Sequence, residues 1–209
     1  MRPILLVLAL ATNAMGMELV RRDVWFGIEA LPTDFDFTLA TPTGDLSGSD
    51  AFDRAIGIRL GGRWSFSSPG AAGAWVTGAD VRLADATYGS DSTYRTTGLG
   101  LSVGYDRTFG RRWTGYGEVV AELGWAELEF PASFAAPAVS ASGRHTLYGL
   151  RTGALFALSP RWLLDGNVGY VAIESDTDAD GNAFTIDQRG FVIGVGLVWR
   201  WSGAPARLE

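Results

Sequence analysis

Apolar and polar residues alternate with a period of two along most of the chain. In residues 52–66, one parity carries Ile56, Ile58, Leu60, Trp64 and Phe66, and the other carries small and charged residues. Successive side chains of a β-strand point to opposite faces, so this pattern predicts a strand. It is about twice as long as a usual strand of a soluble protein, whereas about ten tilted residues cross a bilayer. The pattern therefore predicts a membrane-crossing strand with one lipid-facing side.

The same alternation recurs and predicts eight strands. They span residues 24–38, 52–66, 74–88, 97–107, 113–129, 144–158, 162–174 and 184–201. In the first of them the apolar parity changes near Pro32, where we expect a bulge or a break.

The predicted connections alternate between short and long. The short ones are residues 67–73, 108–112 and 159–161, and the longer ones are residues 39–51, 89–96, 130–143 and 175–183. Outer-membrane barrels have short periplasmic turns and longer external loops. We therefore expect an all-β fold, an eight-stranded antiparallel up-and-down transmembrane β-barrel, with both termini on the side of the short turns.

Tryptophans gather at one predicted depth. Six are expected at strand ends beside short turns or the C-terminus: Trp64, Trp75, Trp113, Trp162, Trp199 and Trp201. Trp25 is expected at the same level, and Trp125 near the other rim. Aromatic residues at one depth are typical of a girdle at the membrane interface, whereas the core of a soluble β-sandwich would not sort them by depth.

Charged residues occupy the parity that we assign to the lumen. The expected lumen network consists of Asp53, Arg59, Arg63, Asp80, Arg82, Glu118, Glu122, Arg151 and Asp165. Asp106 and Arg200 share this parity. Such charges are costly in lipid but tolerable inside when they are paired. The interior of an eight-stranded barrel is just wide enough for its own side chains, so we expect an ion-pair plug and not acid–base chemistry by Glu118 and Glu122.

Composition excludes several classes of protein. The chain of 209 residues has no Cys, which removes disulfides, thiol catalysis and Cys-based metal sites. Its net charge of −6 argues against a nucleic-acid partner, because no basic stripe neutralises phosphates. It has no apolar run of about twenty residues, as a helical membrane protein would.

The N-terminus has the pattern of a targeting signal. Arg2 is followed by an apolar stretch at residues 4–11 and by small residues before a cleavage position after Gly16, with Ala14 as the alternative. We therefore expect a signal peptide at residues 1–16, an outer-membrane barrel at residues 17–201, and a tail at residues 202–209. The tail is either periplasmic or a cloning remnant.

The last predicted strand ends in GVGLVWRW at residues 194–201. Gly196, Trp199 and Trp201 resemble the C-terminal assembly signal of bacterial outer-membrane barrels, although the family usually ends on the final aromatic residue and this chain continues to residue 209. The mature chain resembles the small eight-stranded barrels of the opacity-protein, OmpX and OmpA-membrane-domain type. This resemblance implies integration into the bacterial outer membrane, contact with its lipids and lipopolysaccharide, and recognition by the barrel-assembly machinery.

Two local patterns suggest chemistry. Asp176, Asp178, Asp180 and then Asp187 have the spacing of ligands in a calcium loop, which makes weak calcium binding a hypothesis. The flanking strands and the Asp-Gly pair instead fit a solvated hairpin tip. His145 is the only histidine. Without a hydroxyl nucleophile on the same face it forms no triad, so we expect an exposed residue at the rim.

These features favour a non-enzymatic barrel, without a required cofactor, that displays external loops. Its expected role lies in envelope integrity, adhesion or surface interaction, with a host or cell-surface ligand at the loops, of which residues 130–143 are apolar enough for contact. A small porin-like channel is the alternative, and a lipid A-modifying enzyme is the third reading. Conductance separates the first two, and mass spectrometry of lipid A tests the third.

Overall fold

The computed structural model describes residues 17–41, 44–68, 70–89, 92–130, 139–179 and 182–202. Within these residues, the regular structure is entirely β. The strands are β1 (Glu18–Ala30), β2 (Asp34–Thr41), β3 (Gly44–Ala51), β4 (Arg54–Ser67), β5 (Gly73–Tyr88), β6 (Ser92–Phe109), β7 (Trp113–Phe130), β8 (Val139–Ala157), β9 (Trp162–Ala179) and β10 (Asn182–Ser202). In this part of the chain, no helix is long and apolar enough to cross a membrane. The expected signal peptide and the residues after Ser202 lie outside the described ranges.

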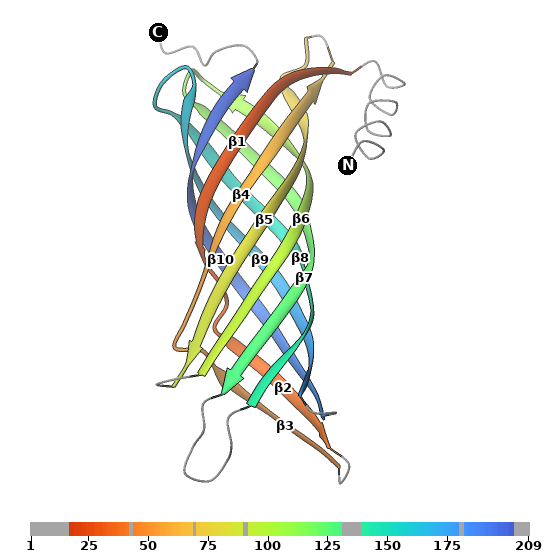
Figure 1. The fold of residues 1–209 in the computed structure, drawn as a ribbon. Coiled ribbons are helices and arrows are strands. Elements are labelled where there is room, and N and C mark those ends of the chain that lie inside the picture. The colour runs from red at the N-terminus through yellow and green to blue at the C-terminus, as the bar shows by residue number, and fades with distance from the viewer. Residues whose placement is uncertain are drawn as a thin grey trace.

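The strands form one antiparallel sheet that closes on itself (Figure 1). Each of β4 to β10 pairs with its neighbour in sequence, and β1 pairs with both β4 and β10. These eight strands make a closed barrel, and β2 and β3 form a hairpin attached to β10. The all-β antiparallel barrel is confirmed, but the sheet has ten strands and not eight.

The two additional strands come from a division of the first predicted hairpin. Ala30 pairs with Ile193 and Phe35 pairs with Gln188, so β2 continues β1 along β10 in unbroken register. Pro32 lies between them and has no backbone N–H for the ladder. The side chain of Gln188 donates to the Pro32 carbonyl at 2.9 Å, which fixes the break.

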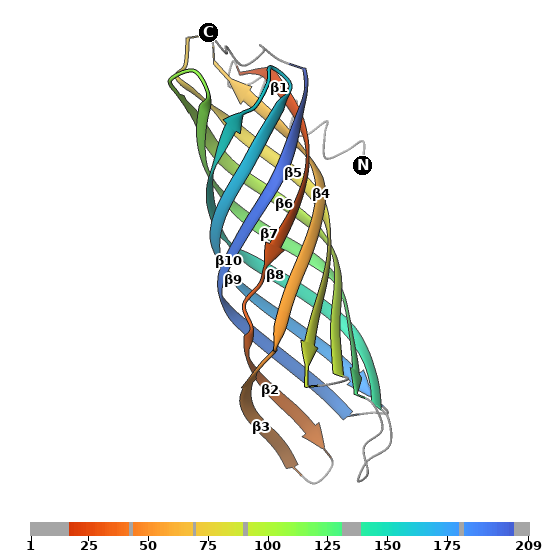
Figure 2. The same cartoon turned by 90° about the vertical axis from the view of Figure 1, so that its left-hand side faces the viewer.

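The expected loop at residues 39–51 is therefore mostly a strand pair. Thr41 pairs with Gly44 and Asp34 pairs with Ala51, so β2 and β3 are aligned over their full length. The hairpin projects from the end of the barrel opposite to the termini (Figures 1 and 2). Strands at that end are also longer than expected: β9 runs to Ala179 and β10 begins at Asn182.

The hydrophobic pattern reverses along single strands. In β7, Val119 and Leu123 are exposed on the outside while Glu122 is buried inside. Only a few residues farther on, Leu128 is buried and Glu127 is exposed, although β7 stays in register with β6 and β8. The side that faces outward is unchanged, and only its chemistry differs. The surroundings of the barrel must therefore change from apolar to aqueous near Trp125.

The same reversal explains the change of parity near Pro32. Phe26 and Ile28 of β1 point outward, whereas Phe35 and Phe37 of β2 are half-buried on the inner side. Because the register on β10 continues across Pro32, the change is one of environment and not of strand geometry. A bulge is not needed to explain it, and the predicted break lies between Ala30 and Asp34.

The barrel thus has two levels. The first is an apolar band, formed by exposed side chains that include Ile58, Leu83, Leu101, Val119, Leu123, Leu150, Phe191, Ile193 and Val195. We call the second level the outer extension: β2, β3, residues 52–55 and the adjoining ends of β5 to β10. Its interior holds a small apolar core of Phe52, Ala55, Ala86, Tyr94, Ala126, Leu128, Ala141 and Ile186.

The structure places the predicted tryptophans at the end of the barrel where the termini lie (Figure 1). Of the six, Trp75, Trp113, Trp162 and Trp201 are exposed on the exterior, and Trp64 and Trp199 are half-buried. Their neighbours are also aromatic: Trp75 lies 5.8 Å from the Tyr105 ring, and Trp113 lies 4.8 Å from the Phe156 ring. Trp25 differs, because it packs inside the barrel beneath Arg59.

Candidate functional site

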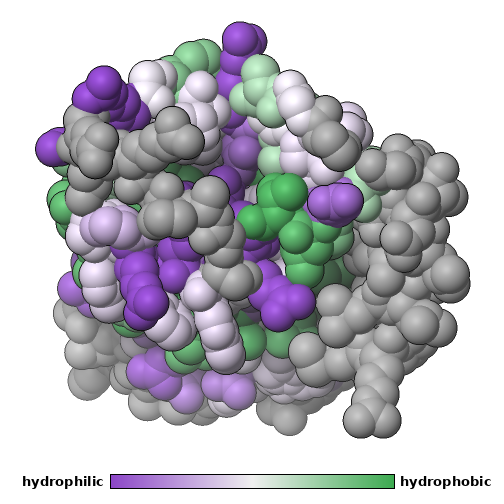
Figure 3. Space-filling model, turned by 90° about the horizontal axis from the view of Figure 1, so that it is seen from above, coloured by the Kyte–Doolittle hydropathy of each residue, from purple (hydrophilic) through white to green (hydrophobic). Residues whose placement is uncertain are grey.

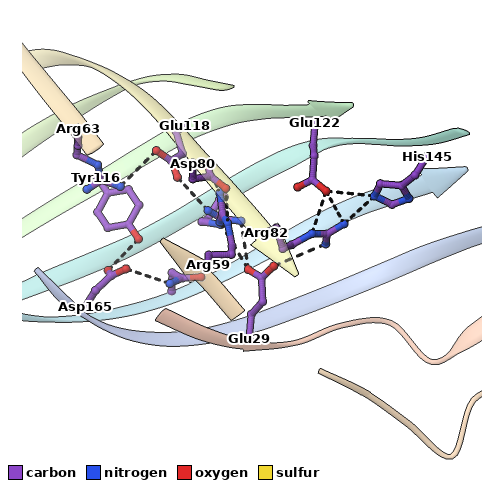
Figure 4. Close-up of polar contacts among 12 residues, drawn as sticks. Glu29, Arg59, Arg63, Asp80, Arg82, Tyr116, Glu118, Glu122, His145 and Asp165 are labelled. Atoms are coloured by element: carbon purple, nitrogen blue, oxygen red, sulfur yellow. Dashed lines mark hydrogen bonds and ion pairs between the residues drawn. The ribbon is translucent and has the colours of Figure 1, made fainter. Parts of the chain in front are cut away.

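Buried ion pairs cross the middle of the lumen (Figure 4). Arg59 on β4 donates two hydrogen bonds to Asp80 on β5, at 2.8 and 3.0 Å. Arg63 on β4 and Arg151 on β8 approach the two oxygens of Glu118 on β7, at 3.3 and 3.4 Å. Each charge faces a partner from a different strand, so the pairs link the walls of the barrel and fill the space between them.

Glu29 on β1 lies at the centre of this network, and sequence reasoning missed it. Its carboxylate lies 3.5 Å from Arg59, 3.7 Å from Arg82 and 3.4 Å from Arg151. Asp23 and Glu29 both occupy the positions of β1 that face the lumen, so the alternation of the sequence could have predicted Glu29 as a lumen residue. Asp23 is also buried, so both acidic residues of this face are lumen residues.

A second polar cluster lies between the ion pairs and the outer extension. Arg82 donates to Glu122 at 3.1 Å and contacts His145 at 2.9 Å. His145 Nδ1 lies 3.1 Å from the Ser175 hydroxyl, which lies 2.6 Å from the Tyr94 hydroxyl. The interpretation of His145 as an exposed rim residue is wrong, because its exposed fraction is 1%. Its position on β8 has inward parity, and the polar partners on β5, β7 and β9 make its burial tolerable.

Ser175, His145 and Glu122 have the residue types of a hydrolytic triad, with Glu122 Oε1 3.2 Å from His145 Nε2. A triad also needs a substrate beside the hydroxyl. The exposed fraction of Ser175 is 0%, and the cavity that touches His145 and Tyr94 holds only about 10 Å³. A cavity of that size admits about one water molecule. The cluster therefore has the geometry of a structural network.

A third cluster of charged side chains lies at the end of the barrel where β1 begins and β10 ends. Arg21 bonds to Asp23 at 2.7 Å and also to Asp106, and Arg200 lies 3.4 Å from Asp23. Seen from this end, hydrophilic side chains gather toward the centre of the ring (Figure 3). The charged pairs thus occur at several depths of the membrane-level interior, between apolar clusters that include Val120 and Leu147 at one depth and Leu155 and Leu163 at another.

The other lumen residues proposed from the sequence are placed as follows. Asp165 is buried and accepts hydrogen bonds from Tyr116 at 2.8 Å and Asn167 at 3.1 Å. Asp53 lies outside the network, because its side chain is exposed. It stands in the link between β3 and β4, where the strict alternation of the strand is interrupted, so parity did not predict its direction.

The residues of the calcium hypothesis lie on two paired strands. Asp176 and Asp178 are exposed on β9, and Asp176 accepts a hydrogen bond from Thr185 at 2.9 Å. Asp187 is half-buried on β10, opposite Glu174. Asp180 lies outside the described residues, and within them no group of three acidic or His side chains could hold a metal ion. Calcium binding stays a prediction.

The residues of the proposed assembly signal lie on β10. Gly196 pairs with Gly27 of β1, and a Cβ at Gly196 would come within 2.6 Å of the Phe26 carbonyl. Glycine therefore permits the close approach of the two strands that seal the barrel. Trp199 and Trp201 follow near the end of the same strand, with ring centroids 5.7 Å apart.

The outer extension contains an aromatic pocket of about 200 Å³. Its lining is Phe35, Phe37, Asp50, Phe52, Tyr88, Ser92, Thr93, Leu128, Phe130, Phe184 and Ile186. These residues come from β2, β5, β6, β7 and β10, together with the end of β3 and Phe52. The pocket therefore lies in the mouth of the barrel at the outer extension. The Phe52–Tyr94 stack lies between it and the polar cluster around His145.

One hydrogen bond connects the β2–β3 hairpin to the rim of this pocket. The Tyr88 hydroxyl donates to Asp50 at 2.5 Å. This bond lowers the pKa of the Asp50 carboxyl below its ordinary value and raises the pKa of the Tyr88 hydroxyl. Both shifts have the same cause, because the bond needs an ionised carboxylate and a protonated phenol.

The outer extension is strongly acidic. Its acidic side chains in the described residues are Asp34, Asp36, Asp45, Asp50, Asp53, Asp85, Glu127, Glu129, Glu174, Asp176, Asp178 and Asp187, and its basic ones are Arg54, Arg95, Arg144 and Arg189. None of them is buried. Arg95 bonds to Asp85 at 3.1 Å, which neutralises part of this charge. The excess of carboxylates favours cationic over anionic ligands at this end.

Comparison with known proteins identifies the fold. Neither a protein-family model nor a curated protein matches the sequence. Among solved structures, the outer membrane protein OprG from Pseudomonas aeruginosa is 12% identical, with a TM-score of 0.55 over 89% of this chain and 98% of its own. The outer membrane protease OmpT from Escherichia coli is 8% identical, with a TM-score of 0.53 over 91% of this chain and 100% of its own. Neisserial surface protein A is 11% identical, with a TM-score of 0.47 over 84% of this chain and 96% of its own.

At these identities the likeness concerns the fold, and OprG and OmpT carry the comparison. Their shared feature with this chain is the closed antiparallel barrel described above. The chain has the transmembrane β-barrel fold of the small bacterial outer-membrane proteins.

Proposed function

We propose that this protein is a non-enzymatic, integral protein of the bacterial outer membrane that displays a rigid outer extension and does not conduct ions. The observation that carries the proposal is the filled lumen. Arg59, Arg82 and Arg151 converge on Glu29 across the barrel. The cavity beside these residues holds only about 10 Å³, too little for a file of water molecules.

The exterior supports the location and the surroundings. An apolar band followed by a charged extension suits a barrel that crosses the lipid and continues into water. Outer-membrane lipids and lipopolysaccharide are then its direct neighbours, and Gly196, Trp199 and Trp201 are the residues that the barrel-assembly machinery would recognise. The outer extension is the part available for surface interaction, adhesion or a role in envelope integrity.

Conductance in planar bilayers tests the proposal. We expect purified wild-type protein to give no steady single-channel current, because charged pairs block the lumen. A double variant, Arg82→Ser with Glu122→Ser, removes one crossing pair and should leak measurably more than the matched control Arg95→Ser with Asp85→Ser, whose ion pair is exposed. Steady, large currents through the wild-type protein would favour the porin-like channel instead.

The enzymatic reading is tested separately. The Ser175–His145–Glu122 contacts are the specific observation in its favour, and burial of the hydroxyl is the observation against it. Mass spectrometry of lipid A from cells with and without the protein should show identical species. A modified lipid A that disappears in Ser175→Ala would identify a lipid A-modifying enzyme.

A further inference from the structure

The aromatic pocket has no role in the closed lumen, and its wall is unusual in composition. Six rings line it: Phe35, Phe37, Phe52, Tyr88, Phe130 and Phe184. An interior that only needed to exclude water could use aliphatic residues, which appear here only as Leu128 and Ile186. The rings therefore give the pocket a chemistry beyond simple apolar character.

The rings support one another in a continuous surface. Phe35 stacks on Phe52 with centroids 4.4 Å apart, and Phe37 stacks on Phe184 at 6.0 Å. Phe130 meets Phe184 edge-on at 6.3 Å, which extends the surface across the mouth. The face of an aromatic ring is electron-rich, and a cation within about 6 Å of its centroid is attracted to it. Phe52 is stacked on Phe35 and on Tyr94, so the other rings of the wall are the ones with a face left for a ligand.

Charge at the rim has the matching sign. Among the described residues that line the pocket, Asp50 is the only charged one. Tyr88 and the Ala51 amide both donate to its carboxylate, the latter at 2.8 Å, so the charge is held in place. An anionic ligand would meet this carboxylate and the acidic extension around it.

The volume sets the size of the ligand. The pocket holds about 200 Å³, and an apolar cavity of about 150 Å³ is enough for benzene. One ring or one trimethylammonium group with a short tail fits such a space, whereas a branched glycolipid or a peptide does not.

We propose that the aromatic pocket binds a small, free quaternary ammonium compound, with the cation against the aromatic wall and Asp50 as its counter-charge. This function goes beyond the display role proposed above and does not depend on whether the lumen conducts. Phosphocholine lipid headgroups share the cation but carry a phosphate, which the acidic rim opposes.

Calorimetry on the full chain tests this proposal. The protein is folded in a maltoside detergent, because detergents with ammonium headgroups would compete. Choline is the probe, and 3,3-dimethylbutan-1-ol is its neutral isostere. We expect choline to bind saturably with a dissociation constant of about 1 mM or below, which is reasonable for about seven heavy atoms. The isostere and glycerophosphocholine should each bind about tenfold more weakly.

Substitutions separate charge from apolar contact. Asp50→Asn keeps the size of the side chain and should weaken choline binding at least about fivefold, and clearly more than it weakens binding of the isostere. The matched control Asp45→Asn, on the same strand but outside the pocket, should have little effect. Phe35→Leu and Phe37→Leu should each weaken choline binding about three- to tenfold, whereas Phe109→Leu at the far end should not.

Each alternative result overturns the proposal. Absence of saturable choline binding up to about 20 mM, in protein shown to be folded by its heat-modifiable gel mobility, excludes a useful site. Equal binding of the isostere would make this a purely apolar pocket, and equal binding of glycerophosphocholine would assign it to lipid headgroups. If Asp45→Asn weakened choline binding as much as Asp50→Asn, the effect would be a general surface field.

Discussion

At the scale of single residues, the interior depends on carboxylates that each serve several guanidinium groups. Glu29 lies within 3.7 Å of Arg59, Arg82 and Arg151. Burying any of these charges alone would be costly, and the shared carboxylate makes the set tolerable. Arg59 gains a further contact from the Trp25 ring, 4.6 Å below its guanidinium carbon.

Removal of the Glu29 carboxylate should therefore destabilise the barrel strongly. Glu29→Ala leaves buried guanidinium groups short of one carboxylate, and breaking such a buried network costs about 3–5 kcal/mol. The measurement is urea unfolding of the protein in detergent micelles or lipid vesicles. Glu18→Ala, an exposed glutamate on the same strand, is the control and should change the free energy of unfolding by less than about 0.5 kcal/mol. Similar effects of the two substitutions would contradict a central role for Glu29.

At the scale of strands, a side-chain hydrogen bond ties the β2–β3 hairpin to the end of β5, in addition to the β2–β10 ladder and the contact between the Phe35 and Tyr88 rings. The Asp50–Tyr88 bond needs an ionised acid and a protonated phenol. Because the pKa of Asp50 is lowered, its contribution is present above the ordinary value near 3.9 and is lost as the pH falls through the lowered one. Because the pKa of Tyr88 is raised, its contribution is present below about 10 and is lost as the pH rises through the raised value.

The position of the hairpin should thus stay fixed between about pH 4 and about pH 10. It should loosen only as the pH falls through the lowered pKa of Asp50 or rises through the raised pKa of Tyr88. Spin labels at Leu46 on β3 and Glu127 on β7 report this as a distance distribution that broadens at both extremes. Tyr88→Phe removes the hydroxyl and should give the broad distribution at every pH. A narrow distribution in Tyr88→Phe would mean that packing alone holds the hairpin.

The strands show what the sequence could and could not predict. Alternation is a local property, so the positions of Ile58, Leu101 and Val119 sufficed to predict strands and their outward faces. The division of the first hairpin could not be predicted, because the apolar parity at Phe35 and Phe37 reverses with the environment while the register continues. Parity alone cannot distinguish a shift of register from a change of solvent.

The polar network of the lumen could also be predicted only in part from the sequence. The alternation of the sequence predicted that Arg59, Arg82 and Glu122 face the lumen. Their partners could not be predicted, because they depend on which strands face one another across the barrel. The contact between Tyr94 and Ser175 joins residues 81 positions apart. His145 was wrongly predicted to be exposed, because its burial depends on such distant partners and the sequence around it does not indicate them.

At the scale of the whole molecule, the barrel has two levels. At the first it is apolar outside and holds charged pairs inside, together with small apolar clusters. At the next it is apolar inside and charged outside. This arrangement is expected where a barrel leaves lipid and continues into water. Arginine substitutions test it directly, because an arginine in mid-membrane costs about 2–4 kcal/mol and one in water costs almost nothing.

Leu101 and Leu46 form a matched pair for this test, since their exposed fractions are 56% and 61%. Leu101 lies in the apolar band, and Leu46 lies on β3 in the outer extension. In lipid vesicles, Leu101→Arg should lower the free energy of unfolding by about 2–4 kcal/mol, and Leu46→Arg should leave it within about 0.5 kcal/mol of wild type. Equal losses would mean that the two levels do not differ in surroundings.

The most direct test of a lipid-facing exterior around a closed lumen is a spin-label scan of β7 in lipid vesicles. The chain has no native Cys, so single cysteines at Val119, Val120, Ala121 and Leu123 can each carry one label. We predict that labels at positions 119, 121 and 123 collide with oxygen in the lipid and not with a water-soluble nickel complex, and that position 120 is shielded from both. Access of the nickel complex to position 120 would reveal a water-filled channel, and equal accessibility at all four positions would contradict the barrel orientation itself.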